Sequence, residues 1–121
     1  MAEKIVSLDF DGVIMAGKPF DPSCPGDCTG APVPGMPELI RELFAEGWTI
    51  EVTTVRAITL AGRKAVVHWL NTNGCLEYVA RVSATRHFAT VHVDALAIPF
   101  NGDVSGLDEK IRDFVPWNRG V

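Results

Sequence analysis

This sequence of 121 residues lacks the features that mark several large classes of protein. Lysine and arginine (11) are fewer than aspartate and glutamate (15), and the formal net charge of −4 offers no basic field for nucleic acid or an anionic membrane. No segment approaches the apolar length of a membrane span, and the charged, strand-like N-terminus is not typical of a signal peptide. Three cysteines, an odd number, do not indicate a disulfide framework. We therefore expect a cytoplasmic protein with no membrane partner and no extended nucleic-acid surface.

The residues that are present indicate one folded domain. Hydrophobic residues make up 47% of the chain and charged residues 21%, a balance that argues against disorder. A chain of this length can bury a single core. We predict a single domain over residues 1–121.

The strongest functional signal lies in residues 4–14. A run of β-branched and aliphatic residues leads to Asp9, Asp11 follows two positions on, and Gly12 allows a sharp turn. The run predicts a buried parallel strand, and ligands bind beyond the carboxyl ends of such strands. Two carboxylates this close need a cation or a shared proton, and Mg²⁺ suits oxygen ligands combined with a substrate phosphate. The alternative is a plain turn, because Asp and Gly both favour turns.

Residues 13–36 predict an irregular, proline-rich flap, since six of the eight prolines lie between Pro19 and Pro37. Gly12 to Lys18 matches the opening of a phosphate-binding P-loop, which leaves a nucleotide-binding protein as a weaker alternative. However, Pro19 stands where a Ser or Thr should bind Mg²⁺. The spacing Cys24-x-x-x-Cys28 is half of a zinc site without a second Cys/His pair.

Periodicity predicts the remaining elements. We expect helices over 35–47, about 58–73, and a last helix that buries Val104, Leu107, Ile111 and Phe114. Four further strands are expected over 48–54, 78–82, 91–94 and, at the sheet edge, 98–100. These elements predict a three-layer α/β/α Rossmann-like sandwich of about five mostly parallel strands.

The stretch Leu8-Asp9-Phe10-Asp11-Gly12-Val13 resembles the first motif of the haloacid dehalogenase-like (HAD-like) superfamily of Mg²⁺-dependent phosphohydrolases. The resemblance implies that Asp9 attacks phosphorus and forms an aspartyl-phosphate, that Asp11 is the general acid and base, and that both contribute to the metal site. Gly12 is expected beside the substrate.

The second HAD-like motif, a Thr or Ser at the end of the next strand with Arg two places on, resembles Thr54 and Arg56. Thr53 is the alternate. Both threonines and Arg56 are therefore expected to bind substrate. The alternative is a strand end followed by a helix N-cap, for which Thr is suited.

The last two motifs resemble those of small HAD-like proteins of bacteria and their phages, in which a Lys, an apolar strand, Asp-Asp and Ala-Ile-x-Phe-x-Gly follow one another. Here Arg86 replaces the Lys, Asp94 matches the first acid, and Ala95 replaces the second. Arg86 is the predicted catalytic cation, with His87 as an alternative, and Asp94 a metal ligand. Asp103 is a further acid in the next loop.

The resemblance implies a Mg²⁺-dependent phosphomonoesterase without a full cap domain, with the Asp9 strand between those ending at Thr54 and Asp94. An open site admits a phosphorylated small molecule, a nucleotide, a nucleic-acid end or a phosphoprotein. Because Arg86 and Ala95 depart from the family, the alternative is a HAD-like fold kept as a binding or regulatory module.

Overall fold

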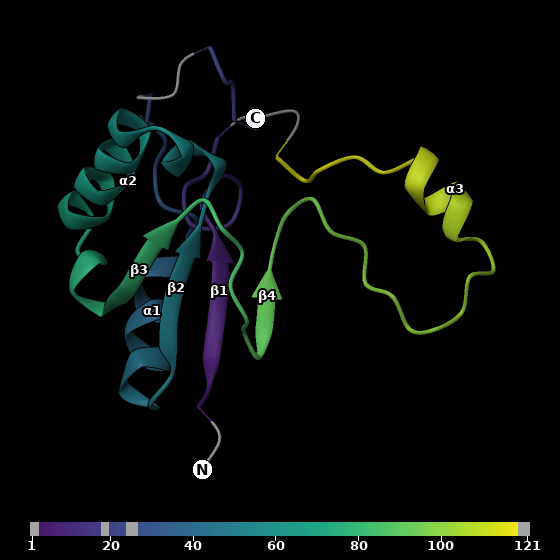
Figure 1. The fold of residues 1–121 in the computed structure, drawn as a ribbon, viewed down its shortest axis with the longest axis horizontal. Helices are drawn as coiled ribbons and strands as arrows, with labels where there is room; N and C mark the ends of the chain where they lie inside the picture. Colours follow the sequence, from purple (N-terminus) through teal and green to yellow (C-terminus); the bar gives the residue numbers. More distant parts are fainter. Residues whose placement is uncertain (1–2, 18–19, 24–26, 119–121) are drawn as a thin grey trace.

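The structure, a computed structural model, describes residues 3–17, 20–23 and 27–118. Its centre is one parallel sheet flanked by helices, an α/β arrangement compatible with a Rossmann-like sandwich (Figure 1). The sheet has the order β3-β2-β1-β4 and consists of β1 (Ile5–Asp9), β2 (Thr49–Thr53), β3 (Val79–Ser83) and β4 (Val91–Val93). The helices are α1 (Met36–Ala45), α2 (Leu60–Thr72) and α3 (Leu107–Arg112), with short 3₁₀ helices η1 (Val55–Ile58) and η2 (Leu76–Tyr78).

Strand β1 lies between β2 and β4, as the resemblance implied. Val6 pairs with Ile50 on one side and with Val91 on the other, and all three strand pairs are parallel. The carboxyl ends of β1, β2 and β4 therefore meet at one edge of the sheet. Asp9 ends β1, and Thr54 and Asp94 follow directly after β2 and β4.

The predicted fifth strand over residues 98–100 is wrong, because the described sheet has four strands. Pro99 lacks the N–H that a ladder requires, and the chain has already left the sheet at this point (Figure 1).

The core follows from the alternation of side chains along the strands. The residues that share one face of β1 and β2 are apolar and buried: Val6, Leu8, Ile50 and Val52. They belong to the same cluster as Ile40 of α1 and Val66, Trp69 and Leu70 of α2. The Trp69 Nε1 donates to the Gly30 carbonyl oxygen at 2.8 Å. The rings of Trp69 and Phe10 meet edge-on, with 5.2 Å between their centroids. This contact packs α2 against the residue that separates Asp9 from Asp11.

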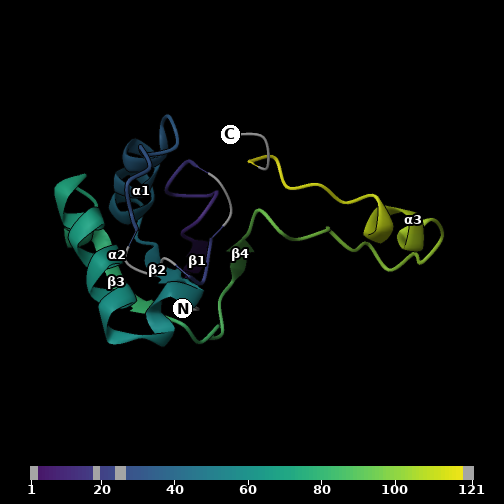
Figure 2. The same ribbon diagram turned by 90° about the horizontal axis from the view of Figure 1, so that it is seen from above.

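The last helix does not pack where the sequence predicted. The chain after β4 stands away from the sheet as an arm that carries α3 (Figures 1 and 2). Val104 is 71% exposed and Ile111 61%, so the predicted burial of this stripe is wrong. The spacing correctly groups apolar residues on a helix, but it does not determine whether a surface is there to cover them. Among the described residues, the helices are too short or too polar to cross a membrane.

The same substitution at two positions tests this division into core and arm. Ile40→Ala removes a fully buried side chain and should lower the free energy of unfolding by about 2–5 kcal/mol. Ile111→Ala removes an exposed one and should change it by no more than about 0.5 kcal/mol. Urea unfolding followed by circular dichroism measures both. An equal loss of free energy of unfolding at the two positions would show that the arm packs against the sheet and its helices.

Candidate active site

A cavity of about 260 Å³ opens at the carboxyl ends of β1, β2 and β4. Six of the eight predicted site residues line it: Asp9, Asp11, Thr53, Thr54, Arg86 and Asp94. The other lining residues are Asn118 and five apolar residues, two of them from the chain after β4: Phe20, Val55, Ala84, Ala95 and Leu96. The structure therefore brings together polar groups from both ends of the chain.

Asp9 ends β1, and its Oδ1 accepts a hydrogen bond from the Phe10 N–H at 2.9 Å. Burial, followed by the charge of Asp94, raises the pKa of Asp9 from 3.8 to about 7. Asp11 adds to the increase, while the Phe10 N–H and Arg86 oppose it. The ionised form of Asp9 is therefore costly here unless a further positive charge approaches.

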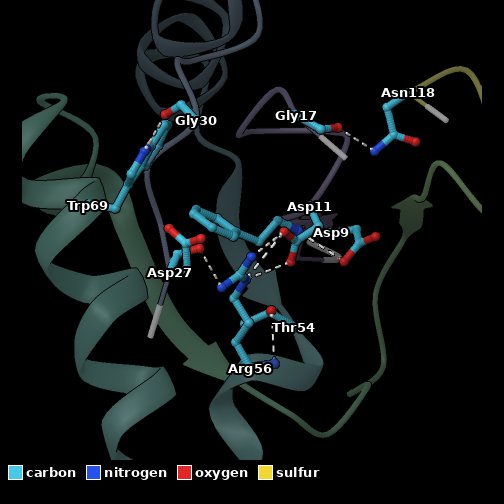
Figure 3. Close-up of polar contacts among 10 residues, drawn as sticks. Asp9, Asp11, Gly17, Asp27, Gly30, Thr54, Arg56, Trp69 and Asn118 are labelled. Atoms are coloured by element: carbon cyan, nitrogen blue, oxygen red, sulfur yellow. Dashed lines mark hydrogen bonds and ion pairs between the residues drawn. The ribbon is translucent and has the colours of Figure 1, made fainter. Parts of the chain in front are cut away.

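Asp11 is held by the guanidinium of Arg56 in a buried, two-pronged ion pair (Figure 3). Arg56 Nη2 donates to Oδ1 at 2.8 Å and Nε donates to Oδ2 at 2.9 Å, with the two side chains 5% and 10% exposed. Burial by itself would lower the pKa of Arg56, but the hydrogen bonds and charge of Asp11 outweigh it and raise the pKa above its ordinary value. Nη1 donates to the Asp27 carbonyl oxygen at 2.9 Å, and the Phe20 ring lies 4.7 Å from the guanidinium. Arg56 thus binds Asp11 and does not line the cavity.

The two threonines at the end of β2 have local partners. Thr53 Oγ1 lies 2.8 Å from Ser7 Oγ across the sheet. Thr54 Oγ1 accepts from the Arg56 N–H at 3.2 Å, so Thr54 caps η1 as the alternative interpretation predicted. Its own N–H donates to the Ser83 carbonyl oxygen. Both residues nevertheless line the cavity.

Arg86 and Asp94 form a second ion pair, with Arg86 Nη2 donating to Asp94 Oδ2 at 2.7 Å. Asp94 Oδ1 accepts from the Leu96 N–H, which fixes the carboxylate at the cavity wall. Arg86 is half exposed and lines the cavity. His87 instead lies 3.4 Å from the Ser83 hydroxyl and is not among the lining residues.

The donor set fits Mg²⁺ only in part. Within the described ranges, no group of three or more His, Cys, Asp or Glu side chains is placed to hold a metal ion. The predicted three-carboxylate set is not brought together as one ligand group, since the Asp11 carboxylate binds Arg56. Mg²⁺, however, needs only one or two carboxylates together with water and a substrate phosphate. Asp9 and Asp94 both line the cavity, and the negative charge of Asp94 raises the pKa of Asp9. These two carboxylates therefore suit such an ion.

The remaining sequence hypotheses concern the flap. Lys18 and Pro19 of the P-loop match and Cys24 of the cysteine pair lie outside the described residues. Cys28 is a free thiol, and burial raises its pKa. Gly12, which was expected beside the substrate, is not among the residues that line the cavity. Its φ of +82° is in the left-handed region, and its carbonyl oxygen accepts a hydrogen bond from Trp117 Nε1 at 2.6 Å.

Sequence reasoning missed the C-terminal contribution to the site. Asn118 is 2% exposed, lines the cavity, and donates from Nδ2 to the Gly17 carbonyl oxygen at 2.9 Å. A Cβ at Gly12 would lie 2.8 Å from that Nδ2 atom, so the turn and the tail fit only because residue 12 is glycine. No motif surrounds Asn118, and nothing in its neighbourhood signals a site.

Comparisons of the chain with protein-family models, with curated proteins and with solved structures find no match. Function is therefore inferred from the chemistry of the cavity.

The raised pKa of Asp9 predicts a pH-dependent gain in stability for Asp9→Asn in metal-free protein. Between pH 3.8 and about 7 the native state keeps the Asp9 proton that the unfolded chain has released. The free energy of unfolding therefore falls as the pH rises through this window. The variant lacks this loss, so it should melt higher than the wild type at about pH 8 and equally at about pH 3.5. Thermal unfolding in EDTA measures both, and a difference that does not vary with pH would contradict the prediction.

Proposed function

We propose that this protein is a Mg²⁺-dependent phosphomonoesterase of the HAD-like type, a cytoplasmic hydrolase that acts through an aspartyl-phosphate. The observation that carries the proposal is the meeting of Asp9 and Asp94 at the ends of adjacent strands, in a cavity that Arg86 also lines. A phosphate placed there would meet a nucleophilic carboxylate, a guanidinium and the side of the cavity that Thr53 and Thr54 line. The residues supporting the proposal come from four separate segments of the chain.

Asp9 would be the nucleophile. The Phe10 N–H holds Oδ1, which leaves Oδ2 as the oxygen that attacks phosphorus, while the alkoxide of the substrate departs. Asp9 and Asp94 would hold Mg²⁺, which when bound offsets the charge of the carboxylates and the phosphate. Arg86 would bind the phosphoryl oxygens through its planar fork, since it is half exposed and already faces this wall.

Asp11 would protonate the leaving group and later activate water. The Asp11 carboxylate already accepts two hydrogen bonds from a buried guanidinium, which leaves it less free to contact a leaving group. This single contact favours the alternative function, a binding or regulatory module that retains phosphate affinity with little turnover. No cap covers the site among the described elements, so a nucleotide, a nucleic-acid end or a phosphorylated small molecule are all candidate substrates.

Asp9→Asn tests the proposed function directly. The change is nearly isosteric and removes the attacking oxygen, so hydrolysis of p-nitrophenyl phosphate with Mg²⁺ should become undetectable while the fold persists. Circular dichroism checks the fold. Ile111→Ala, which alters only the exposed arm, serves as a control with unchanged turnover. Equal turnover by wild type and Asp9→Asn would remove Asp9 as nucleophile.

Asp11→Asn separates acid catalysis from structural support. Loss of the acid should slow an alkyl phosphate by about 10²–10⁴-fold, and p-nitrophenyl phosphate far less, because nitrophenolate leaves without protonation. Arg56→Gln is the matched control, since it breaks the same ion pair but keeps the carboxylate. It should destabilise the protein without the strong dependence on leaving group. If both variants lose the two activities in equal proportion, Asp11 supports the site but is not its acid.

A further inference from the structure

The C-terminal tail holds the turn that follows Asp9. Trp117 Nε1 donates to the Gly12 carbonyl oxygen, and Asn118 Nδ2 donates to that of Gly17. Figure 3 shows Asn118 reaching Gly17 from the opposite end of the chain. The arm that begins after Asp94 therefore returns its far end to the same cavity that it left.

Asn118 carries a chemical feature that its anchoring role does not use. Its Oδ1 is buried and has no hydrogen-bond donor among the described residues. A buried acceptor without a donor costs stability, so the native state gains when a ligand supplies one. The Nδ2 group of the same amide already donates to the Gly17 carbonyl oxygen, and this hydrogen bond fixes the orientation of Oδ1.

The position of this oxygen indicates what it could serve. A Cβ built at Gly12 would lie 3.2 Å from Ala95 Cβ and 2.8 Å from Asn118 Nδ2, so both side chains adjoin the same point of the turn. Ala95 follows Asp94 and carries no polar atom there. Asn118 Cγ, which carries Oδ1, would lie 3.2 Å from the same Cβ, so the amide and the apolar Ala95 side chain both adjoin this point of the turn.

We propose that Asn118 is a positioning residue for the cation of the site, and that its Oδ1 accepts a hydrogen bond from water in the hydration shell of Mg²⁺. This inference rests on the proposed function. An amide oxygen suits the place because Asp9, Asp11 and Asp94 already bring three carboxylates to the cavity wall. It adds an acceptor without adding a fourth negative charge.

Calorimetric titration of the full chain with Mg²⁺ alone tests the proposal. Asn118→Leu keeps the size of the side chain and removes the acceptor, and it should weaken Mg²⁺ binding by about 10–100-fold. Asn118→Ala is the second variant lacking the acceptor, in case the leucine prevents folding. Asn118→Asp keeps an acceptor oxygen, loses the donor to Gly17 and adds a negative charge, so it should bind Mg²⁺ at least as tightly as the wild type. Asn101→Leu, on the exposed arm, is the matched control and should bind as the wild type does.

The outcomes separate this inference from the proposed function. Wild-type affinity in Asn118→Leu and Asn118→Ala would overturn the role of Asn118 while leaving the Mg²⁺ site intact. Equal weakening in the Leu and Asp variants would also overturn it, because the amide would then act only by anchoring the turn. Absence of Mg²⁺ binding in the wild type would overturn both the metal dependence of the proposed function and the role of Asn118.

Discussion

The ion pair between Asp11 and Arg56 is the contact on which the candidate site depends. It joins the turn after β1 to η1, which follows β2, and the same guanidinium binds the Asp27 carbonyl oxygen and stacks near Phe20 in the flap. Removing one partner of a buried pair leaves the other charge unpaired and typically costs about 3–5 kcal/mol. Lysine would not replace Arg56, because a point charge cannot bind both carboxylate oxygens in a planar fork.

The pairing of Arg56 with Asp11 affects the electrostatics of the whole cavity. Arg56 is engaged with Asp11 and Arg86 with Asp94, whereas Asp9 forms no salt bridge within the described part of the chain. Burial and its two acidic neighbours then raise the pKa of Asp9 to about 7. The carboxylate that we propose as the nucleophile is thus the one whose ionised form most needs a cation. The proposed requirement for Mg²⁺ follows from this difference between Asp9 and its two paired acidic neighbours.

Several features could be predicted because their causes are local. The apolar run before Asp9 and the acids at strand ends follow from side-chain alternation, and parallel pairing collects those ends at one edge. Helix α1 follows from its apolar stripe and from the glycines that flank it. The same reasoning was wrong for the strand over 98–100 and for the burial of α3. Both depend on a partner surface, which a short sequence window does not contain.

The sequence by itself determined the four strands of the sheet, the acidic pair that follows its central run and most of the cavity wall, since each depends on residues a few positions apart. Tertiary structure alone decided that Arg56 binds Asp11 and leaves the cavity to Arg86. It also decided that Asn118 completes the turn at Gly12, which lies more than 100 positions earlier in the chain. Such contacts form only after the chain has closed large loops. The geometry of the packed sheet determines which residues meet, and local propensity does not specify these pairs.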